Sequence, residues 1–234
     1  MPKINYNIPA SSYCHGGARP LSSIKYIVLH YTAVNGDSAK NEALYFSRNY
    51  SRYAGAHFFV DQKGEIAQSI SMDITAWSVG GAKYAGTNPQ YYGKCTNYNS
   101  VSIEMCDQVN KEAGAKQIAS VKWLIDYIQK RCPNAKTIIR HYDVNGKPCP
   151  ARYLSASKWS SLKKKVTGGD GFTSYKVEII KAVNVRAKAS STSKKVMVLT
   201  KGGVYTIVTE SKNKRWGKLK SGAGWIYLKK TKKV

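Results

Sequence analysis

The sequence predicts an α/β domain followed by a small all-β domain. Strand-like and helix-like segments alternate through residues 1–166, a pattern typical of an α/β domain with a central mixed sheet flanked by helices. Residues 174–234 contain only short strand-like runs, which glycine and Ser/Thr clusters separate. The glycine-rich residues 167–173 between the two predict a flexible linker. A chain of 234 residues has room for one or two domains, so this division agrees with its length.

The first strongly patterned segment is residues 24–32, I-K-Y-I-V-L-H-Y-T, whose β-branched and aromatic residues predict a strand. His30 lies near the end of this strand. A lone histidine in such a place is more often a hydrogen-bonded core residue than a ligand, so both interpretations stand until further ligands are found. A helix is expected over residues 39–49, with Asp37 or Ser38 as its N-terminal cap.

A hairpin and a long loop are expected next. Residues 56–60 and 65–71 predict two strands, and D-Q-K-G at 61–64 predicts the turn between them. Residues 77–98 are rich in Gly, Asn and Tyr and have neither a helical nor a strand period. They predict a long loop, and loops of this length are often functional.

Residues 99–106, N-S-V-S-I-E-M-C, predict a further strand with an unusual glutamate. Alternation along the strand places Glu104 on the face opposite Val101 and Ile103. A glutamate in so apolar a strand lies either on a solvated face or in a site. Residues 117–131 then form the clearest predicted helix, because their apolar residues recur at helical spacing.

A strand over residues 136–141 leads into R-H-Y-D-V-N-G-K-P-C-P at 140–150, and a short amphipathic helix is expected over 155–166. The Asp, Asn, Gly and Pro residues of 140–150 disfavour a continuing helix or strand, so the backbone must turn. A turned loop can bring His141 and Cys149 around one point. Both are zinc ligand types.

His30, His141 and Cys149 together form a candidate metal site. Three protein ligands leave a fourth tetrahedral position for water, which is the pattern of catalytic rather than structural zinc. Hydrolysis of an amide also requires a proton acceptor and a group that stabilises the oxyanion. Glu104 is the candidate acceptor, and Lys147, two residues before Cys149, is the candidate for the oxyanion.

The second domain carries more than half of the net positive charge. Its strand-like runs are residues 175–180, 183–187, 196–199, 204–209, 216–220 and 224–228. Residues 174–234 contain 16 Lys+Arg and 2 Asp+Glu, a balance of +14, out of +25 for the whole chain. Such a surface favours a polyanion, which could be nucleic acid, anionic lipid or an anionic bacterial wall.

Other sequence features exclude some protein classes. No run approaches the roughly 18 apolar residues of a membrane helix. The N-terminal residues have no apolar core, so no secretory signal peptide is predicted, and we expect synthesis in the cytosol. The five cysteines are odd in number and widely spaced, which is a poor disulfide framework.

Several of these segments resemble the zinc-dependent N-acetylmuramoyl-L-alanine amidases of the type-2 family, relatives of the peptidoglycan recognition proteins. The matching segments are Y-I-V-L-H-Y-T at 26–32, A-H-F-F-V-D at 56–61, A-W at 76–77, N-S-V-S-I-E-M at 99–105 and residues 140–150. The resemblance implies a mixed sheet flanked by helices. It also implies hydrolysis of the bond between the lactyl group of N-acetylmuramic acid and L-Ala of the stem peptide.

The resemblance implies specific roles for the same residues. His30, His141 and Cys149 fall on the zinc ligands, Glu104 on the catalytic glutamate of bacterial and phage members, and Lys147 on the lysine that precedes the ligand cysteine.

Other positions agree with the family only in part. Ala56 stands where recognition proteins carry a catalytic tyrosine, so that role must fall to Glu104. The A-W pair ends at Trp77, and Ser78 replaces a histidine that lines the substrate groove in many relatives, so Trp77 and Ser78 are candidate substrate contacts. His57 aligns with a histidine common in phage members, and it is either structural or a substrate contact.

Residues 175–228 resemble a bacterial SH3 domain, through V-N-V-R-A-K-A-S-S-T-S-K-K-V and R-W-G-K-L-K-S-G-A-G-W-I-Y-L. This implies an SH3-like barrel that binds the cell wall, with Tyr205, Trp216 and Trp225 as candidate contacts. The combination resembles a phage endolysin against a Gram-positive host. Such an enzyme acts on the wall after holin-type export or lysis.

Three other functions were compared with a zinc amidase. A non-catalytic peptidoglycan-binding protein is disfavoured because Cys149 is present. A host autolysin remains the alternative to a phage enzyme. Nucleic-acid binding is suggested by the aromatic residues among lysines near Trp216 and Trp225. It is not expected, because SH3-type core positions and an anionic wall account for the same residues.

Overall fold

The computed structural model describes residues 1–168, 175–211 and 213–234. The chain divides into two compact units, Met1–Gly168 and Gly169–Val234, and the division falls within the expected linker 167–173. Most of that linker lies outside the described residues. Among the residues that the structure describes, no helix has the length and apolar character to cross a membrane.

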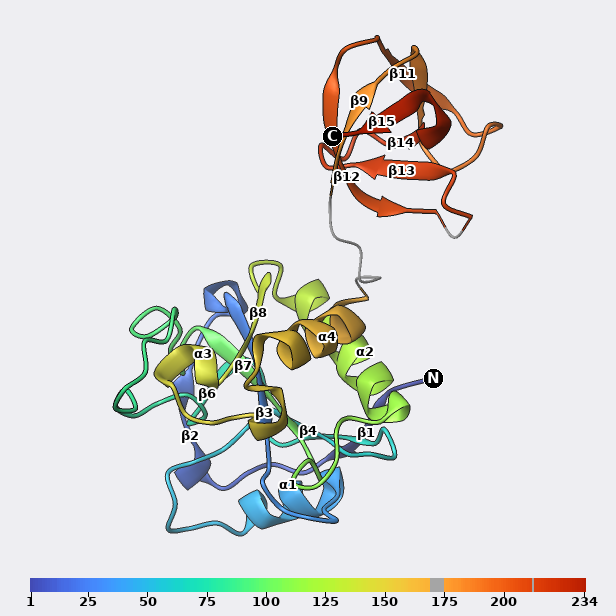
Figure 1. Ribbon diagram of the computed structural model, residues 1–234. Coiled ribbons are helices and arrows are strands. Elements are labelled where there is room, and N and C mark those ends of the chain that lie inside the picture. The colour runs from blue at the N-terminus through green and yellow to red at the C-terminus, as the bar shows by residue number, and fades with distance from the viewer. Residues whose placement is uncertain (169–174, 212) are drawn as a thin grey trace. The chain divides into compact units, whose positions relative to one another are not determined.

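The first unit is built on a mixed sheet of six strands in the order β1-β5-β4-β7-β3-β8 (Figure 1). All neighbouring pairs are parallel except β4 and β5, which form the expected hairpin. The strands are β1 (Ile4–Asn7), β3 (Tyr26–Tyr31), β4 (Phe58–Val60), β5 (Ile66–Gln68), β7 (Ser100–Met105) and β8 (Thr137–Arg140). A separate pair consists of β2 (His15–Ala18) and β6 (Ile74–Ala76).

Helices cover both faces of this sheet. They are α1 (Ala39–Ser47), α2 (Ala115–Arg131), α3 (Tyr142–Asn145) and α4 (Ala156–Thr167), with 3-10 turns at Ser12–Cys14, Leu21–Ser23 and Ala151–Tyr153. On one face, α2 and α4 pack against each other and against the larger core. On the other face, α1 packs against Phe59 and Ala67, whose side chains alternate with those of the larger core.

The larger core forms where the alternating apolar residues of a strand meet the apolar face of a helix. Val101, Ile103 and Met105 alternate along β7 and face α2, whose Leu124 and Ile128 meet them at helical spacing. All five side chains are fully buried. Burial of a side chain of this size contributes about 1.5–3 kcal/mol relative to exposure, so this face of the sheet is a principal source of stability.

A helix begins where the sequence predicted if the sequence contains a recognisable N-terminal capping residue. The Ser38 side chain accepts a hydrogen bond from the Asn41 N–H and begins α1. The helix expected at 117 begins earlier, at Ala115, after an N-cap glycine. Gln117 is therefore not the first residue of the helix. It is buried, and its side-chain amide donates to the Val60 and Cys106 carbonyls.

The second unit is an all-β fold with a seven-stranded sheet in the order β11-β10-β14-β13-β12-β9-β15. Its strands are β9 (Tyr175–Ile179), β10 (Val183–Arg186), β11 (Lys195–Leu199), β12 (Val204–Glu210), β13 (Trp216–Leu219), β14 (Trp225–Tyr227) and β15 (Thr231–Lys233), with a 3-10 turn at Leu228–Lys230. The small apolar core includes Val185, Ile207 and Ile226. The sequence predicted six of these strands and missed β15.

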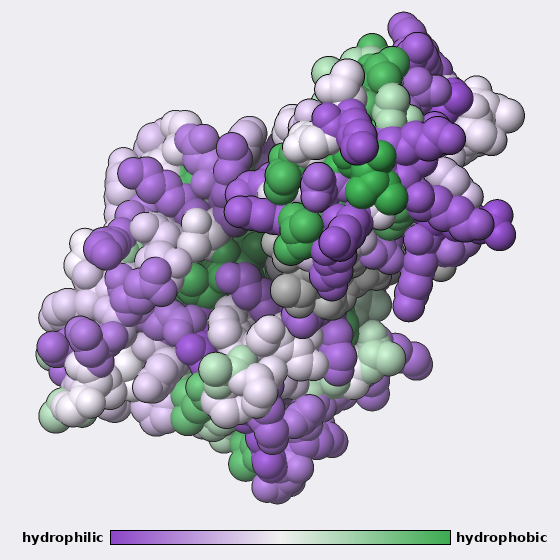
Figure 2. Space-filling model, turned by 45° about the horizontal axis from the view of Figure 1, so that its top comes forward, coloured by the Kyte–Doolittle hydropathy of each residue, from purple (hydrophilic) through white to green (hydrophobic). Residues whose placement is uncertain are grey.

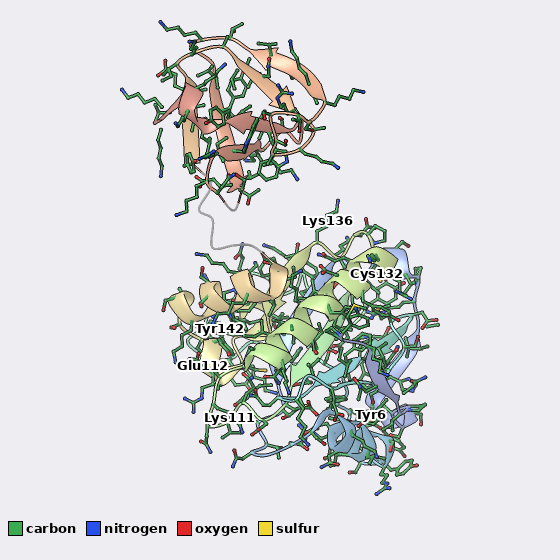
Figure 3. The ribbon with its side chains drawn as sticks, turned by 90° about the vertical axis from the view of Figure 1, so that its right-hand side faces the viewer. Tyr6, Lys111, Glu112, Cys132, Lys136 and Tyr142 are labelled. Carbon is green, nitrogen blue, oxygen red and sulfur yellow. The ribbon has the colours of Figure 1, made fainter. Side chains whose placement is uncertain are left out.

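All five cysteines are buried free thiols. Figure 3 shows Cys132 at the C-terminal end of α2 and Lys136 beyond it, where the chain returns towards β8. The sulfur atoms of four cysteines thus belong to the packing of the fold. Cys149 lies elsewhere, in the loop described next.

Candidate metal centre

Two of the candidate residues begin as partners across parallel strands. His30 on β3 pairs in register with Glu104 on β7. On the other side of β3, Leu29 pairs with Arg140, the last residue of β8, so His141 leaves the sheet at the same edge. Carboxyl ends of neighbouring parallel strands meet at one edge of a sheet, which is why three residues distant in sequence converge here.

The segment after β8 turns as expected, but its first part is one helical turn, α3, rather than an irregular loop. Asp143 holds this turn, because its carboxylate accepts from the Arg140 guanidinium at 2.6 Å and from the Arg140 N–H at 2.9 Å. Gly146 ends the helix with a positive φ of 84°. The chain then returns, and the Tyr142 N–H donates to the Cys149 carbonyl at 2.9 Å, which places Cys149 beside His141.

His30, His141 and Cys149 lie close enough to bind one metal ion. Their ligand atoms are all within 4.8 Å of one another, and the Cys149 Sγ is 3.8 Å from the His30 Nδ1. Tetrahedral zinc separates a thiolate sulfur from an imidazole nitrogen by roughly 3.5 Å, so the spacing matches. His30 Nε2 and both ring nitrogens of His141 are buried without a hydrogen-bond partner. Buried imidazole nitrogens need a partner, and a metal ion would supply one to a single nitrogen of each ring.

The electrostatics of the three side chains agree with this arrangement. Burial and neighbouring cationic groups lower the pKa of His30 well below its usual range and that of His141 to about 3. Both imidazoles are therefore neutral, the form that ligates metals. Burial raises the pKa of the Cys149 thiol far above its usual range. A thiolate at this position consequently requires a cation beside it.

Glu104 lies beside these three residues, and part of its side chain is exposed to solvent. Its side chain is 20% exposed, and its Oε1 is 3.8 Å from the His30 Nδ1. Its Oε2 is buried and has no hydrogen-bond partner. Burial raises the pKa of Glu104 to about 7, while Lys147 and Arg52 oppose that rise. A carboxyl group with such a pKa can both accept and return a proton near neutral pH.

A groove passes over the metal group. Two cavities of about 700 Å³ each share the residues Ala54, Trp77, Ser78, Tyr84, His141 and Lys147. Lys147 is an exposed cation on this shared border. Trp77 and Ser78, which the sequence suggested as groove residues, also lie there. The Ser78 hydroxyl is buried without a partner.

The long loop 77–98 forms one wall of this groove. The Tyr84 N–H donates to the Asn145 carbonyl at 2.8 Å, and the Tyr91 N–H donates to the Asp143 carbonyl at 2.9 Å. These bonds attach the loop to α3, the helical turn that follows His141 and precedes Lys147. The loop therefore has a definite place beside the site, although it has no helix or strand of its own.

For His57 the sequence left open a structural role or a contact with substrate, and its surroundings favour the structural role. His57 is fully buried and lines none of the cavities described here. Its Nδ1 lies 3.0 Å from the Ser102 hydroxyl, and its Nε2 is 2.8 Å from the Arg19 guanidinium. The ring joins β7 to the segment before β3, which is the structural alternative that the sequence left open.

Sequence reasoning missed two charged residues of the groove, Arg52 and Glu42. Arg52 is exposed and acts on the pKa of Glu104. Glu42 lies buried in the first turn of α1, where burial and a hydrogen bond with Asp37 raise its pKa to about 9. The sequence contained one signal for it, because Glu42 falls on the same helical face as the buried Ala39 and Ala43.

The three suggested wall contacts of the second unit are not brought together. Trp216 is 8% exposed and packs beside Tyr227 at a ring-centroid distance of 5.3 Å. It borders a cavity of about 440 Å³, whereas Tyr205 and Trp225 do not. Tyr205 packs against the core from β12, and Trp225 pairs with Arg186 of β10.

Comparison with known proteins gives a consistent result. The family model described as N-acetylmuramoyl-L-alanine amidase matches residues 20–152, which is more than half of the chain. The N-acetylmuramoyl-L-alanine amidase CwlA of Bacillus subtilis strain 168 is 30% identical over 188 residues, covering 78% of this chain and 64% of that protein. The amidase BlyA of the same strain is 34% identical over 175 residues, covering 69% and 46%. The chain thus spans less than two thirds of the length of these curated relatives.

Solved structures resemble the first part of the chain. A mutant endolysin from Bacillus subtilis superposes with a TM-score of 0.53 at 27% identity, covering 71% of this chain and 99% of that chain. The catalytic domain of XlyA gives a TM-score of 0.54 at 26% identity, covering 69% and 97%. The mixed sheet with flanking helices is therefore the fold of this group of proteins.

Proposed function

The chain belongs to the N-acetylmuramoyl-L-alanine amidase family, and from this premise we propose that it is a zinc-dependent hydrolase of peptidoglycan. The bond it cleaves in this proposal is the amide between the lactyl group of N-acetylmuramic acid and L-Ala. The observation that carries the proposal is the buried group of His30, His141 and Cys149, which lies beside Glu104 and lines the groove.

The metal ligands in this proposal are His30, His141 and Cys149, with two neutral imidazoles and one thiolate. Bound zinc supplies Lewis-acid polarisation of a carbonyl and lowers the pKa of water. The ligands come from the end of β3 and from the two ends of the segment after β8. Because a hydrogen-bonded turn holds that segment, the site is assembled before substrate arrives.

Glu104 and Lys147 supply the remaining chemistry. The Glu104 carboxylate takes the proton of the attacking water and returns it to the leaving nitrogen of L-Ala. Its free Oε2 and a pKa near 7 suit both transfers. Lys147 brings its cation to the groove, where it stabilises the negative charge that develops on the carbonyl oxygen.

The wider role in this proposal is bacteriolysis. The name of one structural neighbour, an endolysin from Bacillus subtilis, supports an endolysin-like enzyme. Its Bacillus origin and that of the curated relatives favour a Gram-positive wall as target. The second unit is proposed as an SH3-type wall-binding domain, which raises the local concentration of enzyme on its substrate. Release to the wall by holin-type export or by lysis completes this role.

Digestion of purified Gram-positive walls tests the proposal. The zinc-loaded chain should clear the suspension and release stem peptides with new N-terminal alanine, and a metal-stripped sample should do neither until zinc is restored. New reducing sugar ends without free alanine would identify a glycosidase instead. Binding to the walls with no new ends of either kind would identify a non-catalytic wall-binding protein.

A further inference from the structure

The second unit contains a pocket that the amidase family model, which ends at residue 152, does not reach. It measures about 440 Å³, within the range of pockets that bind small chemical groups. Three cationic side chains, an amide and an aromatic pair border it: Arg186, Arg215, Lys230, Asn213, Trp216 and Tyr227. Aspartate and glutamate are absent from the residues that line it.

Two of the cations are held in place and still have free donors. The Arg186 guanidinium donates through one nitrogen to the Ser193 carbonyl at 2.6 Å. The Lys230 ammonium donates to the Ala182 carbonyl at 3.0 Å. A guanidinium has five N–H donors and an ammonium has three, so each group keeps several for a ligand. Carbonyl partners also leave both positive charges uncompensated.

The third cation has no partner among the described residues. Arg215 is exposed, and no hydrogen bond, ion pair or ring contact involves its guanidinium in the part of the chain that the structure describes. Its backbone N–H donates to the Asn213 side chain at 3.1 Å, which fixes where the side chain starts. Arg215 is therefore available to a ligand at the border of the pocket.

Trp216 and Tyr227 give the pocket an apolar wall. Their rings meet at 5.3 Å with an interplanar angle of 55°. Trp216 and Tyr227 also pair across β13 and β14, so the sheet itself fixes their positions. These rings give a bound group an apolar surface to pack against beside the cations.

The rest of the unit adds a field of the same sign. Residues 174–234 carry 16 Lys+Arg and 2 Asp+Glu, a balance of +14, and hydrophilic residues dominate much of the face seen in Figure 2. Of the two acids, Glu210 accepts from the Tyr175 hydroxyl at 2.5 Å, and Glu178 lies in the middle of β9. Neither borders the pocket. A ligand with many negative charges is attracted to such a surface.

The geometry points to a phosphate group as the ligand, carried by an anionic polymer of the bacterial wall. The cations come from β10, from the residue before β13 and from the 3-10 turn after β14, so donors come from separate segments. A tetrahedral phosphate offers oxygens in several directions, whereas one arginine is enough for a planar carboxylate. The pocket thus anchors the chain to phosphate, separately from the groove that meets the peptide. The wall as location rests on the proposed amidase function; the pocket and its phosphate chemistry do not.

Wall binding by the full chain tests this inference without any need for hydrolysis. The background is a Glu104→Gln chain, so that walls stay intact, and the bound fraction is measured by sedimentation at about 150 mM salt. Arg215→Gln should weaken binding about tenfold, because hydrogen bonds to charged groups contribute that much. Lys218→Gln is the matched control, since Lys218 is exposed on β13 outside the pocket and its change removes the same charge. It should weaken binding less than about threefold.

Two further arms identify the ligand. The first uses walls from which the phosphate polymers have been extracted. The Glu104→Gln chain should bind these walls as weakly with Arg215 present as with Arg215→Gln added. Inorganic phosphate should displace the chain from native walls at lower concentration than acetate at equal ionic strength. If Arg215→Gln and Lys218→Gln weakened binding equally, the pocket would not be the binding site. Attraction by the overall positive charge of the unit would then account for binding. If extracted walls bound the chain as well as native walls, and binding still depended on Arg215, the ligand would not be phosphate. The carboxylates of the wall peptides would be the ligand instead.

Discussion

His30 and Glu104 face each other from neighbouring parallel strands, with the His30 Nδ1 3.8 Å from the Glu104 Oε1. Their register fixes the separation between a metal ligand and the proposed proton acceptor. Both strands are interior strands of the sheet, so the core fixes the backbone positions from which the two side chains extend. Lys147 and Arg52 oppose the effect of burial on the pKa of Glu104 and so favour its charged form in this partly buried place.

Glu104→Gln should abolish turnover while the metal stays bound. The amide keeps the size of the side chain but cannot accept a proton, so kcat should fall by about 10²–10⁴. Metal content after dialysis and the cleavage rate are measured on the same sample. Glu112→Gln, at an exposed ion pair with Lys158, is the control and should retain activity. Loss of metal from the Glu104 variant would show a ligand or structural role instead.

Removal of one ligand should remove metal and activity together. Cys149→Ser or His141→Ala leaves only two of the three ligands in the buried group. Either variant should retain far less than one zinc per chain by elemental analysis and should have no measurable activity. Cys95→Ser, at a buried thiol outside this group, controls for general damage. Full zinc content in the Cys149 variant would contradict the ligand assignment.

Lys147→Gln should reduce kcat by about 10²–10³ and change KM little, because its cation acts on charge that develops only in the transition state. Lys147 lies on the border between the two cavities of the groove. Lys63→Gln removes the same charge at an exposed position elsewhere and should be neutral. Steady-state kinetics on a soluble muropeptide separates the two parameters. A pure rise in KM would instead make Lys147 a ground-state contact.

His57→Gln should cost stability rather than catalysis. The change disturbs a buried contact with Ser102 and the acceptor of the Arg19 guanidinium. Loss of such buried partners costs about 1–3 kcal/mol, which thermal or denaturant unfolding of the metal-loaded chain would detect. The cleavage rate of the folded variant should stay near that of the parent. A large loss of kcat at full stability would restore His57 to the substrate site.

Glu42→Gln should stabilise the protein increasingly as pH rises. Burial and Asp37 raise the pKa of Glu42 from 4.5 to about 9, so the folded state holds a proton that the unfolded state releases. Stability attributable to this carboxyl is complete below about pH 4.5 and falls as pH rises towards 9. At pH 7 the variant should gain on the order of 1–3 kcal/mol. Unfolding curves at pH 5, 7 and 8.5 whose difference stays constant would contradict this.

The regular elements of the sheet and the long helix could be predicted because each has a visible period. The strand at His30, the strand at Glu104 and the helix ending at Arg131 were placed within about two residues of their observed bounds. Strands β1, β2, β6 and β15 were missed. Each is three or four residues long and is defined by its pairing partner rather than by its own pattern.

The roles of some residues could not be predicted from local sequence, because they depend on partners that are distant in the chain. The loop at 140–150 was expected to turn, but its helical turn depends on the contact between Arg140 and Asp143. The role of His57 could not be assigned, because Arg19 lies 38 residues before it and Ser102 lies 45 residues after it. His30 and Glu104 were 74 positions apart in the sequence, and only the strand register joins them.

Hydrolysis of a soluble muropeptide in ¹⁸O-labelled water tests the central claim most directly. The zinc-loaded chain should place one ¹⁸O atom in the lactyl carboxylate of N-acetylmuramic acid and release an unlabelled peptide that begins with alanine. Mass spectrometry of the two products reads both outcomes at once. Label at the anomeric carbon of a sugar, or in a carboxylate of the peptide, would contradict amide cleavage at this bond.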